Sequence, residues 1–526
     1  MSSQQIKQLH LKAQKLINSQ QSKAAHQACV QILALDPKHA DAHFLLGMIA
    51  MNMQQMSKAI GLIEVAISGQ PNNAEYYAFL ARALSLVNRY QEAYTAVEHG
   101  LMLGSNKAMV NDTLGVVLSR LGEHKRAVPL FNQAISQQPN NPNLYYNLAA
   151  SLKFSGEFTL AEAAYEKVIS LKPDYFQAHS ALAELQTATI ESNNIQRIQK
   201  QLDCISGNVD GQLHLCHAMA KELECIGEYH QALNVLKRGN GAKKLALGYN
   251  VTHDQSLFLA IKNLFSANFA KEQTSGNSSK QPIFVLGMPR SGTTLVDRII
   301  SSHTEVVSAG ELQNFAVELK KLSKTSSRQV LDIETISRAK ELDFLDLGNR
   351  YLNSVGPVNG NATHFIDKMP LNFLYIGLIK KALPNAKIII LNRHAMDTCL
   401  SNFRTLFAVN FSYYNYAYDL LDSGRYFSLF RDLMDFWQSL YGDSLLEMSY
   451  ENLVAEPEKH IRVLLEYCGL DWQQNCLDFH NNPAPVSTAS SVQVRQPINS
   501  SSIGRWQRYG DELNELQEYL ATQGLF

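Results

Sequence analysis

Residues 284–295 read Phe-Val-Leu-Gly-Met-Pro-Arg-Ser-Gly-Thr-Thr-Leu, and this segment decides the fold of the second half of the chain. The apolar run from Ile283 to Leu286 predicts a buried parallel strand, and the residues after Thr294 predict the start of a helix. Gly287 and Gly292 bracket the turn between them at the Gly-x4-Gly spacing of a phosphate-binding loop. Backbone N–H groups at such a helix N-terminus attract anionic oxygens. The segment therefore predicts a strand, a phosphate loop and a helix in succession.

This loop departs from that of nucleoside triphosphatases at one position. Thr293 stands where the lysine that holds a γ-phosphate belongs, while Thr294 keeps the hydroxyl position of the motif. Arg290 supplies a cation from inside the loop, and its planar guanidinium suits tetrahedral anions. We therefore expect a nucleotide whose chemistry is not triphosphate cleavage, bound by Arg290, Ser291, Gly292, Thr293 and Thr294. A strand-to-helix turn without a ligand is the alternative interpretation of this motif alone.

Composition and charge limit the class of protein. The 526 residues are 45% hydrophobic and 18% charged, which is enough to bury more than one core. A formal charge of −1 leaves no global basic field, so we expect no nucleic-acid partner. No long apolar run and no leader-like N-terminus are present, so we expect no membrane span and a cytoplasmic protein. The 7 cysteines form no C-x-x-C pair, so they imply neither a disulfide framework nor a zinc site.

The first 240 residues contain a repeat. Its period of 34 residues is marked by Pro37, Pro71, Pro139 and Pro173, with Ser105 in the missing position. Small residues keep the same step in two series, which are Gly47, Ala81, Gly115, Ala149 and Ala183, and Ala25, Ala59, Ala93, Ala127 and Ala161. This period is the tetratricopeptide one, and two small positions per repeat let paired helices approach closely. The sequence predicts an all-α tetratricopeptide solenoid over residues 1–240.

A solenoid of this kind exposes a concave groove that usually holds extended peptide. We therefore expect a protein partner or a peptide substrate in the repeat domain. A rigid spacer or an oligomerisation arm is the alternative, and nothing in one sequence separates the two.

The periodicity ends near residue 240. We assign residues 241–280 to a connecting helix and a polar linker. Beyond it, helical segments alternate with strand-like runs, which cover 282–286, 364–366, 386–391 and 445–448. This alternation predicts crossover units and a parallel sheet, so residues 281–526 are expected to form an α/β domain that resembles phosphate-loop proteins.

Two further cationic positions follow strands of this domain. Arg393 stands at the carboxyl end of a buried strand, where ligands of open α/β sheets bind, and Ser401 lies two turns along the next helix. One face can therefore hold both residues, and a surface ion pair of Arg393 is the alternative. Lys368 also follows a strand, and an ion pair with Asp367 or Asp397 is the alternative to a functional role.

Taken in order, these motifs resemble the PAPS-dependent sulfotransferases, particularly the protein-tyrosine sulfotransferase branch (PAPS is 3′-phosphoadenosine 5′-phosphosulfate). The resemblance covers roughly residues 281–510, and the loop at 289–295 resembles the 5′-phosphosulfate loop of that family. It implies in-line transfer of a sulfuryl group from PAPS to a hydroxyl, leaving adenosine 3′,5′-bisphosphate, with no metal. The residues beside the loop offer no metal site either, since no H-x-x-x-H pattern or acidic triplet falls there.

The resemblance also implies roles for single residues. Arg393 and Ser401 have the spacing of the pair that grips the 3′-phosphate, and Lys368 takes the place of the lysine near the leaving oxygen. The reaction that the resemblance implies gives Arg290 a catalytic role too, because Lys368, Arg290 and the loop amides would stabilise the charge that develops on this oxygen. Tyr450 matches a nucleotide-contacting tyrosine. Ser490 and Arg505 match a phosphate-binding serine and a basic residue in the loop that closes over PAPS.

A general base is needed if the acceptor is a phenol, because tyrosine with a pKa of about 10 is un-ionised at pH 7. Glu311, in Gly310-Glu311-Leu312, resembles the catalytic carboxylate of the family. Two departures from the family pattern weaken this match, since Leu312 replaces a second Glu and the spacing from His303 is one residue longer. His303 is the rival base, or a helix cap.

The sequence thus predicts a sulfotransferase acting on protein tyrosine presented by the repeats. Carbohydrate or a small phenol stays open as the acceptor. A repeat scaffold with a degenerate nucleotide domain is the main alternative from another class, and Arg290, Lys368, Arg393 and Ser401 argue against such decay. A kinase is disfavoured by Thr293 in the lysine position.

Overall fold

A computed structural model describes residues 2–265, 269–270, 275–325, 327, 329–359, 362–409, 411–482, 484, 486, 488 and 493–526. The contacts group the chain into two compact units, Met1–Lys172 and Pro173–Phe526. The domain boundaries expected near residues 240 and 280 stay predictions. Within the described ranges, no helix combines the length and the apolar character that a membrane crossing requires.

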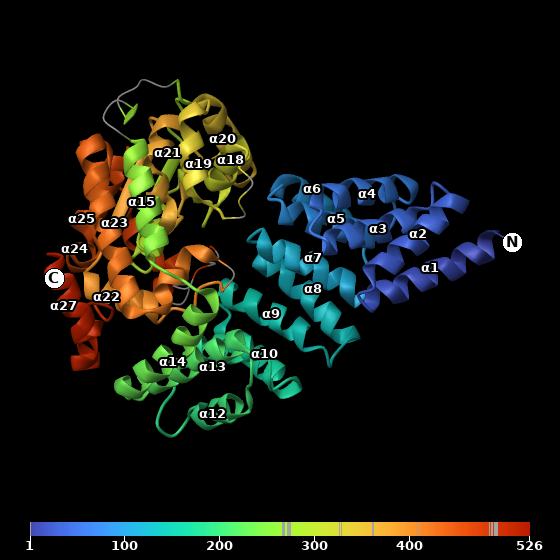
Figure 1. Ribbon diagram of the computed structural model, residues 1–526, viewed down its shortest axis with the longest axis horizontal. Helices are drawn as coiled ribbons and strands as arrows, with labels where there is room; N and C mark the ends of the chain where they lie inside the picture. The colour runs from blue at the N-terminus through green and yellow to red at the C-terminus, as the bar shows by residue number, and fades with distance from the viewer. Residues whose placement is uncertain are drawn as a thin grey trace. The chain divides into compact units, whose positions relative to one another are not determined.

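The first unit is a series of paired helices, as the period of 34 residues predicts. Neighbours in sequence pack side by side (Figure 1). The helices are α1 (Ser2–Asn18), α2 (Ser22–Leu35), α3 (Ala40–Asn52), α4 (Met56–Gly69), α5 (Ala74–Leu86), α6 (Tyr90–Leu103), α7 (Ala108–Arg120), α8 (His124–Gln137), α9 (Pro142–Ser155) and α10 (Phe158–Leu171).

The regular period has a packing cause and a capping cause. A Cβ on Gly47 of α3 would lie 2.7 Å from Ile63 of α4, so only a small residue lets these helices touch. Two residues after the periodic proline, the side chain of Asn73 accepts a hydrogen bond from the first turn of α5, and that of Asn141 does the same for α9. The periodic proline therefore marks the turn that begins each new pair of helices.

The second unit opens with more helices of the same kind. They are α11 (Phe176–Leu185), α12 (Ile195–Cys204), α13 (Val209–Cys225), α14 (Tyr229–Leu247) and α15 (Thr252–Leu264). In the pair α13 and α14, a Cβ on Gly239 would lie 2.6 Å from the Cβ of Cys216. The two helices therefore approach as closely as those of the first unit.

A five-stranded parallel sheet follows, as predicted. Its strands are β1 (Pro282–Gly287), β2 (Val306–Ser308), β3 (His364–Asp367), β4 (Lys387–Asn392) and β5 (Leu446–Ser449), in the order β2-β3-β1-β4-β5. The three-residue edge strand β2 is the one that the apolar pattern did not indicate. A strand this short carries too few alternating positions to be recognised by periodicity.

Both faces of the sheet are buried by helices. Along β1, Ile283 and Val285 enter one core and Phe284 and Leu286 enter the other. The first core is completed by α17 (Thr293–Ile300), α24 (Tyr450–Ala455), α25 (Pro457–Cys468) and α26 (Gln474–Leu477). The second core includes α18 (Asn314–Ser323), α19 (Ile333–Arg338), α20 (Phe344–Asn359), α21 (Ile376–Ala382), α22 (Ala395–Phe403), α23 (Leu420–Tyr441) and α27 (Asn514–Thr522).

The second core also contains apolar residues of the last repeat helices. Leu215 and Met219 of α13, Leu236 of α14 and Phe258 of α15 belong to the same buried cluster as Phe284 of β1. The repeat helices after Pro173 and the sheet therefore share one continuous core.

Candidate active site

The sheet order places the site. From β1 the chain first moves to β2 and β3 on one side, and then to β4 and β5 on the other. The carboxyl ends of β1 and β4 therefore form a topological switch point, where open α/β sheets bind ligands. At this point Gly287 lies in register with Leu391, and a Cβ on Gly287 would lie 2.5 Å from the Leu391 carbonyl oxygen.

The phosphate loop runs from Met288 to Gly292 and leads into α17. Gly292 has φ of +107°, and a Cβ there would lie 2.6 Å from the ring of Tyr450, so both conformation and space require glycine. Arg290 has φ of +67°, a left-handed conformation that costs a non-glycine residue about 1–2 kcal/mol. The Oγ of Ser291 is buried and has no hydrogen-bond partner among the described residues. The loop thus presents a strained arginine and a buried hydroxyl.

The guanidinium of Arg290 faces other polar groups of the site. Its Nε lies 3.4 Å from Ser401 Oγ, and one terminal nitrogen lies 3.2 Å from Gln493 Oε1. Burial, and then the positive charges of Arg393 and Arg404, lower the pKa of Arg290 to about 10. Arg290 still carries its charge at pH 7, so three neighbouring cations make the loop attractive to an anion.

Arg393 connects the segments that surround the loop. It donates a hydrogen bond of 2.8 Å to the carbonyl oxygen of Arg290 and another to the carbonyl oxygen of Ser502. Its guanidinium carbon lies 5.0 Å from the centre of the Tyr450 ring. The structure thus brings Arg290, Arg393, Ser401 and Tyr450 together at the switch point.

Asn402 is a supporting residue that the sequence analysis missed. Its side-chain nitrogen donates to the carbonyl oxygen of Pro289 at 2.7 Å, and its Oδ1 accepts from the hydroxyl of Tyr416 at 2.8 Å. Asn402 is buried, so these bonds hold the phosphate loop against α22. Its position directly after Ser401 was the available signal.

A lysine and a glutamate form a second cluster at the end of β3. Lys368 donates from Nζ to Glu311 Oε1, and its backbone N–H donates to the Gly310 carbonyl oxygen at 2.9 Å. The lysine side chain is 1% exposed and the glutamate side chain 37% exposed. The lysine side chain is therefore enclosed, while the carboxylate is partly exposed to solvent.

The aspartates that were alternative partners of Lys368 are engaged elsewhere. Asp367 accepts from the Tyr351 hydroxyl at 2.9 Å and from Asn372 Nδ2 at 3.2 Å. Asp397 accepts from the backbone N–H groups of Gly504 and Trp506. Burial raises the pKa of Asp367 to about 7, although these hydrogen bonds oppose the rise.

His303 is held by backbone groups on both sides of its ring. Its Nε2 lies 3.1 Å from the Asp471 carbonyl oxygen, and its Nδ1 accepts from the Glu305 N–H at 3.2 Å. Because Nε2 then donates to the carbonyl and Nδ1 is occupied, the ring has no nitrogen available for a proton from a substrate. His303 is therefore engaged on both sides of its ring, whereas the Glu311 carboxylate is partly exposed.

The C-terminal loop places Arg505 differently from the other cations. Arg505 lies at the start of the 3₁₀ segment η7 (Arg505–Leu513) and lies 3.2 Å from Glu224 of α13. The Trp506 ring is parallel to that of His394, with centres 6.1 Å apart.

The remaining predicted site residues are two threonines and a serine. Thr294 Oγ1 lies 3.4 Å from Thr488 Oγ1, and Thr293 is buried. Ser490 lies outside the described residues.

Aromatic side chains of the segment that follows α22 form a group that the sequence analysis did not single out. The Tyr375 and Tyr413 hydroxyls are 2.5 Å apart, and the rings of Phe407 and Tyr414 stack with centres 4.4 Å apart. Burial, and then the negative charge of Glu311, raise the pKa of Tyr414. The charge of Glu311 therefore acts on the Tyr414 hydroxyl.

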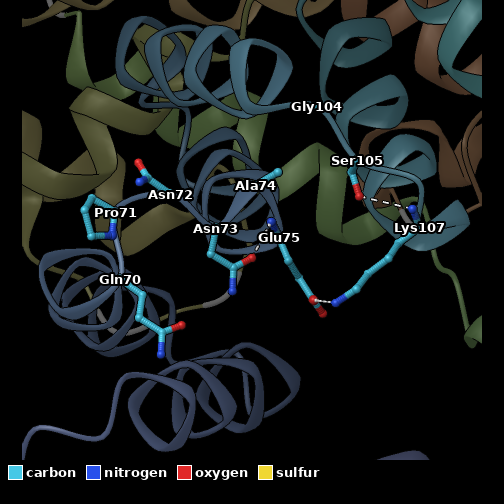
Figure 2. Close-up of a pocket in the computed structure, with 9 residues that line it drawn as sticks. All are labelled: Gln70, Pro71, Asn72, Asn73, Ala74, Glu75, Gly104, Ser105 and Lys107. Atoms are coloured by element: carbon cyan, nitrogen blue, oxygen red, sulfur yellow. Dashed lines mark hydrogen bonds and ion pairs between the residues drawn. The ribbon is translucent and has the colours of Figure 1, made fainter.

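A separate polar pocket of about 560 Å³ lies in the first unit (Figure 2). It is formed by the turns before α5 and α7, and Lys107 there donates to Glu75 at 2.6 Å. Within the part of the chain that the structure describes, no group of three or more His, Cys, Asp or Glu side chains is placed to hold a metal ion.

Both the repeats and the α/β part of the chain resemble known protein families. Residues 282–474 match a family model described as the sulfotransferase family, and residues 16–83 and 118–185 match the tetratricopeptide repeat. The chain carries tetratricopeptide repeats and a sulfotransferase-family domain. The sequence resemblance is therefore confirmed at the level of these families.

Individual relatives are more distant. An uncharacterized protein of Aquifex aeolicus (strain VF5) is 30% identical over 410 residues, which are 77% of this chain and 53% of that protein. Protein-tyrosine sulfotransferase of Drosophila melanogaster is 24% identical over 266 residues, which are 46% of this chain and 51% of that protein. The chain spans about half the length of these two relatives. A solved thermophilic TPR protein of Thermus thermophilus aligns at 17% identity and a TM-score of 0.30, over 34% of this chain and 98% of that one.

Proposed function

We propose that this chain transfers a sulfuryl group from PAPS to a phenolic hydroxyl, and that the physiological acceptor is a protein tyrosine recruited by the repeats. The observation that carries the proposal is the pairing of enclosed Lys368 with partly exposed Glu311 beside the phosphate loop. The Lys368 ammonium can stabilise a leaving oxygen, and the Glu311 carboxylate can accept the proton of an incoming hydroxyl. The distant protein-tyrosine sulfotransferase of Drosophila melanogaster supports the acceptor class.

The residues at the switch point fit a donor with two separate anionic groups. Ser291 Oγ and Arg393 Nε are buried without partners in the described part of the chain, so both have hydrogen-bonding capacity for a ligand. Arg290, Arg393 and Ser401 would hold phosphate oxygens, and the amides at the start of α17 would hold the phosphosulfate. PAPS has this charge distribution, since it carries a 3′-phosphate as well as the reacting 5′ group.

The proposed reaction is a single in-line displacement. The phenolic oxygen forms a bond to sulfur while the bond from sulfur to the bridging phosphate oxygen breaks. Glu311 takes the phenolic proton as the bond forms, and Lys368 stabilises the negative charge that develops on the leaving phosphate oxygen. The products are a sulfate ester and adenosine 3′,5′-bisphosphate.

The aromatic groups beside Glu311 support a phenolic acceptor. The charge of Glu311 acts on Tyr414, whose ring stacks on Phe407, and offset or edge contacts between aromatic rings are worth about 0.5–1.5 kcal/mol. A flat phenol therefore gains binding energy close to the proposed base.

The test is sulfuryl transfer from labelled PAPS by the purified full chain. We expect label in a tyrosine-containing peptide and in a small phenol, and loss of that label in Lys368→Met. Label in a glycan alone would replace the acceptor class, and absence of transfer to every acceptor, together with no binding of adenosine 3′,5′-bisphosphate, would refute the proposal.

A further inference from the structure

Glu224, on the repeat helix α13, binds cations of the sulfotransferase-family domain. It accepts from Nε and a terminal nitrogen of Arg404, from Arg505 at 3.2 Å and from the Tyr509 hydroxyl at 2.5 Å. Its side chain is 4% exposed. A buried carboxylate with four donor atoms, from three residues of the other part of the unit, is a specific contact and not a surface ion pair.

Both arginines adjoin the nucleotide site. Arg404 lies three residues after Ser401, at the end of α22, and its charge contributes to the lowered pKa of Arg290. Arg505 directly follows Gly504, whose N–H is bound by Asp397 of α22. The groups that Glu224 holds are therefore the end of α22 and the start of η7.

A second set of contacts holds the same end of α22. Asn240 of α14 donates to the Phe403 carbonyl oxygen at 2.9 Å, and its Oδ1 lies 2.8 Å from His217 Nε2 of α13. Asn240 and His217 are buried. The last carbonyl groups of a helix have no partners within that helix, so these side chains complete the C-terminus of α22 from outside.

The charges of these residues also affect one another. Arg290, Arg393 and Arg404 repel one another, and the charge of Glu184 on α11 acts in the opposite direction on Arg290. Burial opposes the ionised form of Glu224, but Arg404 and Arg505 lower its pKa. Glu224 thus remains charged and pairs with two arginines whose like charges oppose each other.

We propose that Glu224 is a positioning residue of the nucleotide site, so that the repeat helices α13 and α14 are a structural part of that site. By fixing Arg404 and Arg505, Glu224 sets the end of the helix that carries Ser401 and the loop held by Arg393 and Asp397. This inference rests on the proposed function, because the ligand concerned is the nucleotide of sulfuryl transfer.

Glu222 provides a matched control on the same helix. It is also buried, but it accepts from the backbone and side chain of Asn194, at the start of α12 within the repeats. Glu222→Gln and Glu224→Gln therefore remove equal charges at neighbouring buried positions, and only the second one touches α22 and η7.

The experiment measures binding of adenosine 3′,5′-bisphosphate to the full chain by calorimetry, with thermal unfolding in parallel. We expect Glu224→Gln to weaken binding about tenfold, or about 1.4 kcal/mol. The KM for PAPS should rise while the KM for the acceptor stays within twofold, and Glu222→Gln should leave bisphosphate binding within twofold.

Two outcomes would overturn the inference. The first is wild-type affinity in Glu224→Gln, and the second is an equal loss in Glu222→Gln, which would indicate general destabilisation. If Glu224→Gln does not fold, Asn240→Ala breaks the same end of α22 from α14 and should weaken the bisphosphate in the same direction. Failure of the wild-type chain to bind the bisphosphate would instead refute the proposed function and this inference with it.

Discussion

Replacing Glu311 by glutamine tests its proposed role as a general base while leaving the shape of the site unchanged. Glutamine keeps the size of the side chain and can still accept a hydrogen bond from Lys368, but it cannot take a phenolic proton. A positioned general base contributes roughly 10²–10⁴ to the rate, so we expect kcat for a peptide tyrosine to fall by that factor. Affinity for adenosine 3′,5′-bisphosphate should stay within a few-fold.

The structure also limits the cost in stability. Lys368 is 1% exposed, so the loss of its counter-charge is felt, but Glu311 is 37% exposed and solvent screens the pair. We therefore expect the free energy of unfolding to fall by only about 1 kcal/mol. Thermal unfolding of the variant shows whether it is folded at the assay temperature, a condition that must hold for its rate to be informative.

The assay compares two acceptors at pH 7. A tyrosine peptide needs a base, whereas an acidic nitrophenol is already largely ionised, so Glu311→Gln should slow the first far more than the second. Glu305→Gln is the matched control, because Glu305 is an exposed carboxylate in the preceding segment. Equal losses on both acceptors would refute the role of Glu311 as base, and His303→Asn in the same assay would then test the rival.

Other predictions concern the nucleotide, the repeats and the buried carboxyl group. Arg393→Ala should erase a preference for adenosine 3′,5′-bisphosphate over ADP, a loss of about 1.5–3 kcal/mol measured by calorimetry, and equal binding of ATP by the wild-type chain would contradict the reasoning. Removal of residues 1–172, the first compact unit, should leave bisphosphate binding nearly intact and should lower kcat/KM on a protein acceptor. An unchanged kcat/KM would exclude recruitment of the acceptor by this unit. The folded state raises the pKa of Asp367 from 3.8 to about 7, so it holds a proton that the unfolded chain has lost, and stability should decrease as pH rises from 4 to 7. Asp367→Asn should flatten this slope in denaturant titrations, and an unchanged slope would assign the pH dependence elsewhere.

Local patterns of residues in the sequence predicted much of the fold. The period of 34 residues predicted paired helices because each helix pair needs the same turn and the same small contact positions, as the caps at Asn73 and Asn141 show. The run before Gly287 predicted a buried parallel strand because a strand covered by helices on both faces is apolar throughout. Single positions along a strand and the following helix also placed Arg393 and Ser401 on one face.

Partners distant in the chain could not be predicted in this way. The alternatives offered for Lys368 were nearby aspartates, but its partner is Glu311, 57 residues earlier, because β3 ends beside the loop that follows β2. The family resemblance placed Arg505 in the loop that closes over the nucleotide, and the structure pairs it with Glu224, 281 residues away. Periodicity in the sequence indicates which face of a helix or strand is buried. Only the packing of these elements against one another decides which charged groups come into contact.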